Sequence, residues 1–301
     1  MLKRVLITGK NGYIATSLLT YLRGFPEEYE AAAISLRGTA WETESFSRYD
    51  TVVHCAGHAH IKETAQNAHL YYEINRDLTI AVAKKAEAEG VGQFIFLSSL
   101  SVYGMDEGVI TPETEPRPKS AYGKSKLEAE RGLRAMETEA FRVAILRPPM
   151  VYGDCCKGNY QTLVKLAKKL PAVPDYANQR STVSITRLCE YIKKTIDENA
   201  CGVFVPQDAA YLCTCAEIAR LAAESGRSIP TTKLLNFGPA LLRRFTGKGR
   251  KAFGNLVYRE WEEDETCADR RVGSVARDAV LHERRSAVAG AWICGGRGLQ
   301  L

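Results

Sequence analysis

The start of the chain constrains the fold most, because a short glycine-containing turn separates an apolar run from an amphipathic segment. Residues 4–8 have the pattern of a buried strand ending at Gly9, and residues 13–22 have that of a helix. Further strands are predicted at 31–35, 51–54, 94–98 and 143–146, and a helix from about 121 to 135. A long helix between the third and fourth strands is predicted to bury one face, made of Tyr71, Ile74, Leu78 and Val82. This alternation predicts an α/β fold with a doubly wound parallel sheet.

The regular alternation of strands and helices ends at about Gly153, which indicates a second, smaller region. Helices are expected at 162–170 and 188–196, and a strand at 202–205. Thr214 and Glu217 have the spacing of a capping box for a helix ending near residue 226. We therefore expect a first domain over 1–155, a smaller substrate-binding region over 156–260 that is partly interleaved with it, and an atypical tail over 261–301. The tail has weak periodicity and a composition typical of a flexible end.

The turn after the first strand has the form of a phosphate-binding loop. Gly9 permits a tight turn, and Gly12 lets the backbone approach a pyrophosphate at the N-terminus of the following helix. Ala15 is small enough for the helix to pack closely on the strand. Such a motif is weak alone, but here it lies between a strand and a helix, as a Rossmann-type dinucleotide site requires. The residues expected to bind the cofactor are Gly9, Lys10, Asn11, Gly12, Tyr13 and Ile14.

The end of the second strand bears on which cofactor is bound. An acidic residue there would bind the ribose 2′-hydroxyl of NAD, but this chain has Ser35, Leu36 and Arg37. Arg37 could make a bidentate contact with a 2′-phosphate, and Lys10 could add positive charge. The alternative is a solvated arginine beside a site that takes NAD. We expect NADP or NAD, with NADP favoured.

A tyrosine and a lysine four residues apart form a candidate catalytic pair. On a helix, Tyr122 and Lys126 share a face, so the ammonium can lie near the phenol. To act as a base near neutrality, a phenol must lower its pKa from about 10 by roughly 2–3 units. Ser99, with Ser98 as the alternative, follows a predicted central strand and could hydrogen-bond a reacting oxygen. Each feature alone also occurs on ordinary helix surfaces and strand ends.

Together these motifs resemble the extended short-chain dehydrogenases, in the NAD-dependent epimerase/dehydratase group. The resemblance runs from about Lys3 to Phe237, and the order and spacing of its motifs are specific. The residues that carry it are Thr8-Gly9-x-x-Gly12-x-x-Ala15, Val53-His54-Cys55-Ala56-Gly57, Asn75, Ser98-Ser99 with Val102-Tyr103-Gly104, Tyr122-x-x-x-Lys126, and Leu146-Arg147-Pro148-Pro149 with Val151-Tyr152-Gly153.

The resemblance implies roles for individual residues. Tyr122 would be the acid/base, Ser99 would orient the reacting hydroxyl, and Lys126 would bind the nicotinamide ribose and lower the pKa of Tyr122. Substrate contacts are expected from His60, Ser99 and Arg180. The cofactor contacts expected beyond the glycine turn and Arg37 are Ala56, Gly57, Asn75, Tyr122, Lys126 and Pro148.

The stretch from His58 to Glu63 looks like that of the nucleotide-sugar 4-epimerase and 4-reductase branch. The implied activity is epimerisation of a nucleotide-diphosphate sugar by hydride transfer. The alternatives are an NADPH-dependent reductase of nucleotide 4-keto sugars and, in another class, a non-catalytic NADP-binding sensor. Two positions depart from the family pattern: Ile185-Thr186 replaces a usual aspartate, and Arg259-Glu260-Trp261 begins an unrelated ending.

Charge and composition limit the other partners. The net charge of +6 is mild and spread among acidic residues, so nucleic acid is not expected. No apolar stretch is long enough to span a bilayer or to form a signal-peptide core, and no membrane partner is expected. The nine cysteines lack paired spacing and predict reduced thiols in a cytoplasmic protein. His58 and His60 are assigned to a loop lining the substrate cleft rather than to a metal site.

The chain could also form a homodimer.

Overall fold

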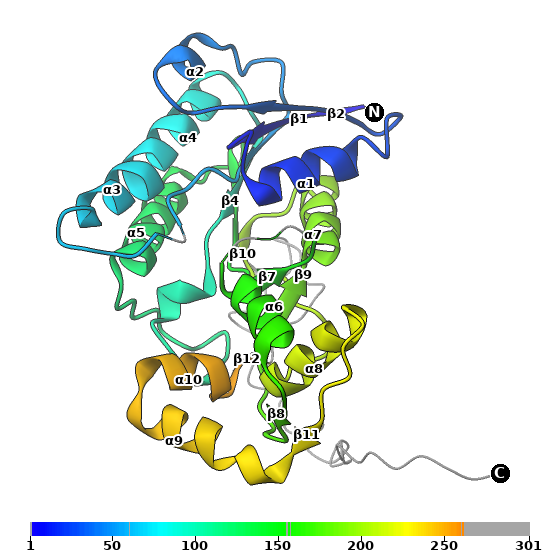
Figure 1. Ribbon diagram of the computed structural model, residues 1–301. Helices are drawn as coiled ribbons and strands as arrows, with labels where there is room; N and C mark the ends of the chain where they lie inside the picture. The colour runs from blue at the N-terminus through cyan, green and yellow to red at the C-terminus, as the bar shows by residue number, and fades with distance from the viewer. Residues whose placement is uncertain (1, 60, 155, 157, 260, 262–301) are drawn as a thin grey trace, which may run out of the picture. The chain divides into compact units, whose positions relative to one another are not determined.

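The computed structural model of the protein describes residues 2–59, 61–154, 156, 158–259 and 261. Residues 1–262 form one compact unit, and the predicted tail lies almost entirely outside the described residues. A six-stranded parallel sheet occupies its centre (Figure 1), which confirms the predicted fold class. Its strands are β1 (Lys3–Thr8), β2 (Tyr29–Ile34), β3 (Thr51–His54), β4 (Gln93–Leu97), β6 (Arg142–Leu146) and β10 (Gly202–Phe204).

The strands are arranged in the order β10-β6-β4-β3-β1-β2, so the chain reverses its direction of winding between β1 and β3. Ligands of doubly wound sheets bind beyond the carboxyl ends of the strands at such a switch point. Here Gly9 follows β1, and the segment 55–57 follows β3. The topology therefore brings two of the predicted cofactor-binding segments together.

Helices cover both faces of the sheet, because neighbouring strand residues point to opposite sides. In β1, Val5 and Ile7 pack against α1 (Tyr13–Leu22) and α7 (Ile185–Asp197), whereas Leu6 belongs to the opposite cluster. The strands are buried on both faces, which explains their continuous apolar sequence. The second face is covered by α2 (Ala40–Thr43), α4 (Leu78–Ala88) and α5 (Ala121–Met136).

The smaller region contains short helices and three two-stranded parallel pairs, β5–β12, β7–β9 and β8–β11. Its elements are β7 (Met150–Tyr152), α6 (Asn159–Lys169), β8 (Val173–Pro174), β9 (Thr182–Ser184), α8 (Thr214–Glu224), β11 (Thr231–Thr232), the 3-10 helix η3 (Lys233–Leu235), α9 (Phe237–Phe245), α10 (Gly247–Phe253) and β12 (Leu256–Tyr258). Before it come the 3-10 helix η2 (Leu100–Tyr103) and β5 (Gly108–Ile110). Because β10 of residues 156–260 belongs to the central sheet and α7 packs against it, the boundary at residue 155 stays a prediction. Among the described helices, none is long and apolar enough to cross a membrane.

The long helix after β3 buries Tyr71 and Val82 as predicted, but two polar residues take the buried positions between them. It consists of α3 (Ala68–Tyr72), a π-helical turn η1 (Glu73–Asp77) and α4. Tyr71, Asn75 and Thr79 are buried, whereas Ile74 and Leu78 are only half-buried. The apolar spacing was misleading because Asn75 and Thr79 find hydrogen-bond partners inside the protein, so their burial is not penalised.

The predicted capping box at Thr214 is also wrong. Helix α8 begins at Thr214, and the preceding residue, Cys213, makes no side-chain cap. The Thr214 hydroxyl instead donates to the carbonyl of Ala252 at 2.6 Å. Glu217 interacts with Arg220 and with the hydroxyl of Tyr160. The pattern Thr-x-x-Glu therefore serves tertiary contacts here.

The thiols agree only in part with the expectation of reduced cysteines. Cys55, Cys189, Cys213 and Cys215 are free. Cys201, in contrast, is disulfide-bonded. The expectation therefore holds for these four thiols and fails for Cys201.

A histidine in β3 is sealed into the core as a neutral ring. His54 is fully buried, with Nδ1 3.1 Å from the hydroxyl of Thr8 and Nε2 3.1 Å from the hydroxyl of Thr79. Thr79 donates its only proton to the carbonyl of Asn75, so Nε2 of His54 must be the donor to Thr79. Burial lowers the pKa of His54 from 6.5 to about 3, and the positive charge of Lys126 acts in the same direction.

We predict that His54 makes the protein less stable as the pH falls. The pKa is depressed in the folded state, so its contribution is complete above the unfolded value of 6.5 and is lost towards about 3. The free energy of unfolding should therefore fall by about 2 kcal/mol between about pH 8 and about pH 5 through this group. Urea unfolding at several pH values should show a shallower pH dependence in His54→Asn. The exposed His69→Asn should keep the native slope, and an unchanged slope in His54→Asn would contradict the assignment.

Candidate active site

The predicted phosphate-binding turn is built as the sequence indicates. Gly9 has a φ of +84°, and a Cβ there would lie 3.0 Å from the backbone nitrogen of Ala56. Gly12 is the N-cap of α1 and offers no side-chain cap, and the first turn of α1 carries no acidic residue. Its N–H groups are therefore available to an anion at the positive end of the helix. Lys10 and Asn11 are exposed on the turn, and Tyr13 lies close to Gly153.

The loop after β3 is tied to α5 through Asn75. The Asn75 side chain accepts from the backbone N–H of His58 at 2.7 Å and donates to the hydroxyl of Ser125 at 3.2 Å. A Cβ on Gly57 would lie 3.1 Å from Asn75 Oδ1 and 3.3 Å from Lys126 Nζ. Gly57, Asn75 and Lys126 therefore meet at one point, and the missing side chain at Gly57 leaves room there.

Ser99 and Tyr122 are brought together at the carboxyl end of β4. The Ser99 side chain lies close enough to the Tyr122 phenol to lower the pKa of that phenol. Burial raises the pKa of Tyr122 above its ordinary value of 10, Ser99 lowers it, and Tyr71 raises it. Ser99 also caps η2 by accepting from the N–H of Ser101 at 3.1 Å. The phenol is thus neutral at physiological pH and has the Ser99 hydroxyl beside it.

Lys126 is buried beside the same strand end. Its ammonium donates to the carbonyl of Leu97 at 2.8 Å and lies 4.5 Å from the centre of the Phe96 ring. Burial lowers the pKa of Lys126 to about 8, while Cys55 and Glu130 oppose the shift. The resemblance implies that Lys126 lowers the pKa of Tyr122, but the influences found on Tyr122 are burial, Ser99 and Tyr71. That role therefore stays a prediction.

Ser98, the alternative to Ser99, has a different task. Its hydroxyl donates to the carboxylate of Glu130, which is itself 1% exposed. Arg147 binds the same carboxylate through two bonds, of 3.1 Å from Nε and 2.6 Å from Nη2, and its Nη1 donates to the Tyr103 hydroxyl at 2.8 Å. The Tyr258 hydroxyl donates to the Arg147 carbonyl. This buried network joins β4, η2, α5, the end of β6 and β12.

Glu130 was missed by the sequence reasoning, although a signal was present. Tyr122, Lys126 and Glu130 are four residues apart and share one helix face. A carboxylate that continues a catalytic face into the core needs a buried cation, and Arg147 in the Leu-Arg-Pro-Pro motif was available. Pro148 of that motif is buried, and its carbonyl accepts from the N–H of Leu100 at 3.0 Å. Pro148 therefore helps to place the segment that carries Ser99.

An aromatic series extends from the β3 loop to Tyr122. The His58 ring packs edge-on against Tyr71 with 4.7 Å between ring centres, and Tyr71 packs edge-on against Tyr122 at 6.2 Å. Glu63 accepts from the N–H of Ala121 at the start of α5. Tyr71 and Glu63 are further residues that motif reasoning missed. His60, predicted to bind substrate, lies outside the described residues.

Arg37 and Arg180, predicted to contact the cofactor and the substrate, lie away from the Ser99–Tyr122 pair. Arg37 follows β2 and is exposed, and the β2 carbonyl of Ile34 accepts from the N–H groups of Gly9 and Lys10, which places the end of β2 beside the glycine turn. Arg180 is half-buried and donates to the Gly254 carbonyl at 3.0 Å. Burial lowers the pKa of Arg180, and Asp106 opposes this.

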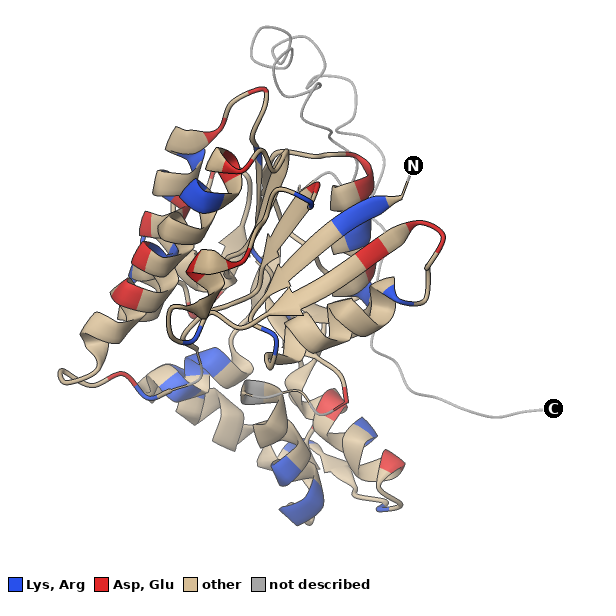
Figure 2. Ribbon diagram, turned by 90° about the horizontal axis from the view of Figure 1, so that it is seen from above, with Lys and Arg blue, Asp and Glu red and all other residues tan. Residues whose placement is uncertain are grey.

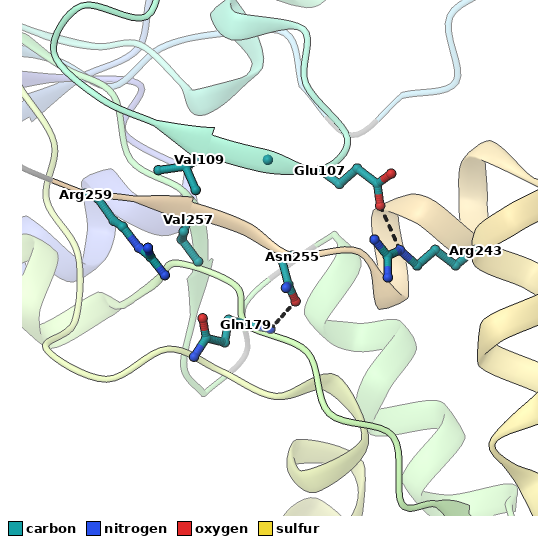
Figure 3. A pocket seen from close by; sticks show the side chains of 8 residues that line it. Glu107, Val109, Gln179, Arg243, Asn255, Val257 and Arg259 are labelled. Atoms are coloured by element: carbon teal, nitrogen blue, oxygen red, sulfur yellow. Dashed lines mark hydrogen bonds and ion pairs between the residues drawn. The ribbon is translucent and has the colours of Figure 1, made fainter. Parts of the chain in front are cut away.

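Next to Arg180 in the chain, Gln179 lines a pocket of about 360 Å³ beside the paired strands β5 and β12 (Figure 3). Arg259 and Asn255 border it, and Arg243 of α9 is paired with Glu107 at its rim at 2.9 Å. None of the predicted site residues lines this pocket, so it is distinct from the Ser99–Tyr122 site.

Fold and site together define a doubly wound sheet with a glycine turn and a Ser-Tyr-Lys set at its carboxyl edge. A model of the NAD dependent epimerase/dehydratase family matches residues 5–173. The chain belongs to this family, which is a family of enzymes.

Sequence relatives point in the same direction. The chain is 33% identical to a UDP-glucose 4-epimerase of Vibrio cholerae over 248 residues, which cover 74% of this chain and 76% of that protein. It is 28% identical over 215 residues to an N-acetyl-alpha-D-glucosaminyl-diphospho-ditrans,octacis-undecaprenol 4-epimerase of Escherichia coli O157:H7, covering 66% and 64% of the two chains.

Solved structures share the fold at low identity. A dTDP-4-dehydrorhamnose reductase from Clostridium acetobutylicum has a TM-score of 0.63 and 22% identity, covering 83% of this chain and 98% of that one. A UDP-glucuronic acid 4-epimerase from Bacillus cereus, in complex with NAD, has a TM-score of 0.65 and 18% identity, covering 85% and 88%. These similarities confirm the fold and include both epimerases and reductases.

We predict that the buried Glu130–Arg147 pair is essential for stability. Glu130→Ala leaves the Arg147 guanidinium without its carboxylate and Ser98 without its acceptor, and should cost about 3–5 kcal/mol. Urea unfolding followed by circular dichroism measures this. As a control, Glu115→Ala removes an acidic partner from an exposed pair with Arg117, whose side chains are 71% and 80% exposed, and should have little effect. Equal losses of unfolding free energy in the two variants would show that the buried pair contributes no more to stability than an exposed pair.

Proposed function

We propose that the protein is an NAD(P)-dependent nucleotide-sugar epimerase in which Tyr122 is the acid/base. The observation that carries this proposal is the position of Ser99 next to the Tyr122 phenol at the carboxyl edge of the sheet, beside the buried Lys126, whose ammonium donates to the carbonyl of Leu97. The UDP-glucose 4-epimerase relative, similar over three quarters of its own length, supports a nucleotide-diphosphate sugar as substrate and C4 as the reacting carbon. Arg180 and His60 remain proposed substrate contacts.

The residues present fit a nicotinamide dinucleotide. The uncapped start of α1 and the absence of side chains at Gly9 and Gly12 form a place for a pyrophosphate. Arg37 and Lys10 would meet the adenosine ribose, and Lys126 would meet the nicotinamide ribose. Ala56, Gly57 and Asn75 would border the cofactor. Two exposed cations beside the end of β2, with no carboxylate at 35–37, favour NADP over NAD.

The chemistry then divides between cofactor and protein. When bound, the nicotinamide supplies a hydride acceptor and, in its oxidised form, a positive charge. Tyr122 moves the proton between its phenol oxygen and the sugar hydroxyl, and the Ser99 hydroxyl orients that oxygen. Burial favours the neutral phenol, so Tyr122 is ready to return a proton, whereas accepting one requires positive charge nearby. The keto sugar would then turn within the site, and return of the hydride to the other face of the same carbon would complete epimerisation.

Reduction of a nucleotide 4-keto sugar is the second candidate. The stretch between Gly12 and Asp50 is compact, with only the four-residue helix α2 after β2, and this short length resembles that of the sugar reductases. A reductase would use the same three residues, with Tyr122 donating its proton to the keto oxygen. The two reactions differ in whether reduced cofactor is consumed.

We predict that Tyr122→Phe lowers turnover of UDP-glucose by about 10²–10⁴-fold while leaving cofactor affinity nearly unchanged. The variant removes the proton-transferring oxygen but keeps the ring that packs on Tyr71. Product formation by chromatography and cofactor titration by fluorescence measure the two effects. Tyr21→Phe, on α1, is the control and should retain full activity. Retention of more than a few per cent of activity in Tyr122→Phe would exclude this residue as the acid/base.

We predict that Arg37→Asp weakens NADP binding far more than NAD binding. The carboxylate would repel a 2′-phosphate and could accept from a 2′-hydroxyl. Titration of both cofactors against the native chain and the variant gives the two affinity ratios. Arg23→Asp, an exposed change of the same charge at the end of α1, should alter neither ratio. Equal weakening of both cofactors by Arg37→Asp would contradict the assignment of NADP.

A further inference from the structure

The segment formed by η3 and α9 exposes large apolar side chains to an unusual extent. Six of the nine exposed large apolar residues among the described parts of the chain lie here. Phe237 is 71% exposed, Phe245 69% and Leu241 56%, while Leu234, which precedes α9, is 85% exposed. Single exposed apolar residues are ordinary, but contiguous ones mark a contact surface.

These side chains share one face of α9. Phe237, Leu241 and Phe245 are four residues apart and therefore follow one another along the helix. Pro239, nearly opposite, is buried, and α9 packs along α10, where a Cβ on Gly249 would lie 2.0 Å from the Leu242 carbonyl. The face of α9 that carries the phenylalanines is thus turned away from the protein. We call Leu234, Phe237, Leu241, Leu242 and Phe245 the apolar stripe.

The segment that carries the apolar stripe is basic, and the acidic residues paired with it, Glu107 with Arg243 and Asp106 with Lys251, come from another segment. Residues 233–253 contain no aspartate or glutamate, and Figure 2 shows basic residues gathered on helices away from the central sheet. The Arg244 guanidinium lies 5.8 Å from the centre of the Phe245 ring, so charge and apolar surface adjoin. Arg243 is engaged with Glu107. The basic residues of this segment are Lys233, Arg243, Arg244, Lys248, Arg250 and Lys251.

We propose that the apolar stripe docks on an anionic phospholipid surface, with α9 lying in the plane of the interface. A helix with aromatic and leucine side chains on one face and lysine and arginine beside them is suited to the boundary between headgroups and acyl chains. The cations meet lipid phosphates, and each adds attraction at a negative surface. This departs from the expectation that the chain has no membrane partner, which considered only segments that cross a bilayer.

Charge complementarity favours this occupant over a second copy of the chain. A symmetric dimer through the apolar stripe would bring two sets of the same cations together, and such like-charge contacts are repulsive. A lipid surface, in contrast, offers phosphates around an apolar layer. The proposal does not depend on which sugar the active site converts.

Vesicle co-sedimentation of the full chain tests the proposal. The protein should bind vesicles of phosphatidylcholine mixed with phosphatidylglycerol, should bind pure phosphatidylcholine much less, and should be released by high salt. Phe237→Ser with Phe245→Ser should weaken binding at least about tenfold, because two aromatic side chains no longer enter the interface. Val109→Ser, which changes an exposed apolar residue of β5, should leave binding unchanged.

A second pair of variants tests the charges independently of the apolar stripe. Arg244→Glu with Lys248→Glu should remove the preference for phosphatidylglycerol, whereas Lys84→Glu with Arg131→Glu, on α4 and α5, should retain it. Thermal melts establish that each variant is folded. If the serine variants do not fold, the charge variants alone test the proposal. The proposal is overturned if the native chain does not bind phosphatidylglycerol vesicles or if the α9 variants bind them as the control variants do. It is also overturned if sedimentation velocity shows an oligomer that the α9 variants dissociate and that does not bind vesicles.

Discussion

The buried ion pair between Glu130 and Arg147 is the interaction on which the rest of the site depends. A carboxylate and a guanidinium that are almost fully buried are tolerable only when both are paired and hydrogen-bonded. Ser98 and Tyr103 complete the shell, so the end of β4 and the 3-10 turn after it are held in place. Ser98 is thereby committed to Glu130, and Ser99 is the serine that lies beside Tyr122.

A second constraint is lack of space at the switch point of the sheet. Gly9 approaches Ala56 so closely that any side chain at Gly9 would press on backbone, and Gly57 is equally confined by Asn75 and Lys126. Asn75 links the loop after β3 to α5 through hydrogen bonds to His58 and Ser125. The cofactor loops and the catalytic helix are therefore positioned by one another, and a displaced loop would also move Lys126.

The sequence predicted those parts of the structure that depend on local pattern. The strands of the central sheet, α1 and α5 follow from periodicity, and Tyr122 and Lys126 share a face because of helix geometry. The choice between Ser98 and Ser99 required the position of Glu130, which is brought near only by tertiary packing. On the helix after β3, Tyr71 and Val82 are buried as predicted, but Asn75 and Thr79 were missed because they are buried polar residues with partners from distant segments. The β5–β12 pair joins short strands far apart in the chain, and α9 exposes its apolar face, so neither has a reliable local signal.

The central claim is that Ser99, Tyr122 and Lys126 interconvert a nucleotide sugar without net oxidation or reduction. The most direct measurement is to supply UDP-glucose with the cofactor and to follow both the sugar product and the absorbance of reduced nicotinamide in one reaction. Our account predicts a new UDP-hexose that differs at one carbon, with no lasting change in reduced cofactor. Failure to convert UDP-glucose, together with stoichiometric loss of NADPH when a nucleotide 4-keto sugar is supplied, would contradict epimerisation and identify a reductase.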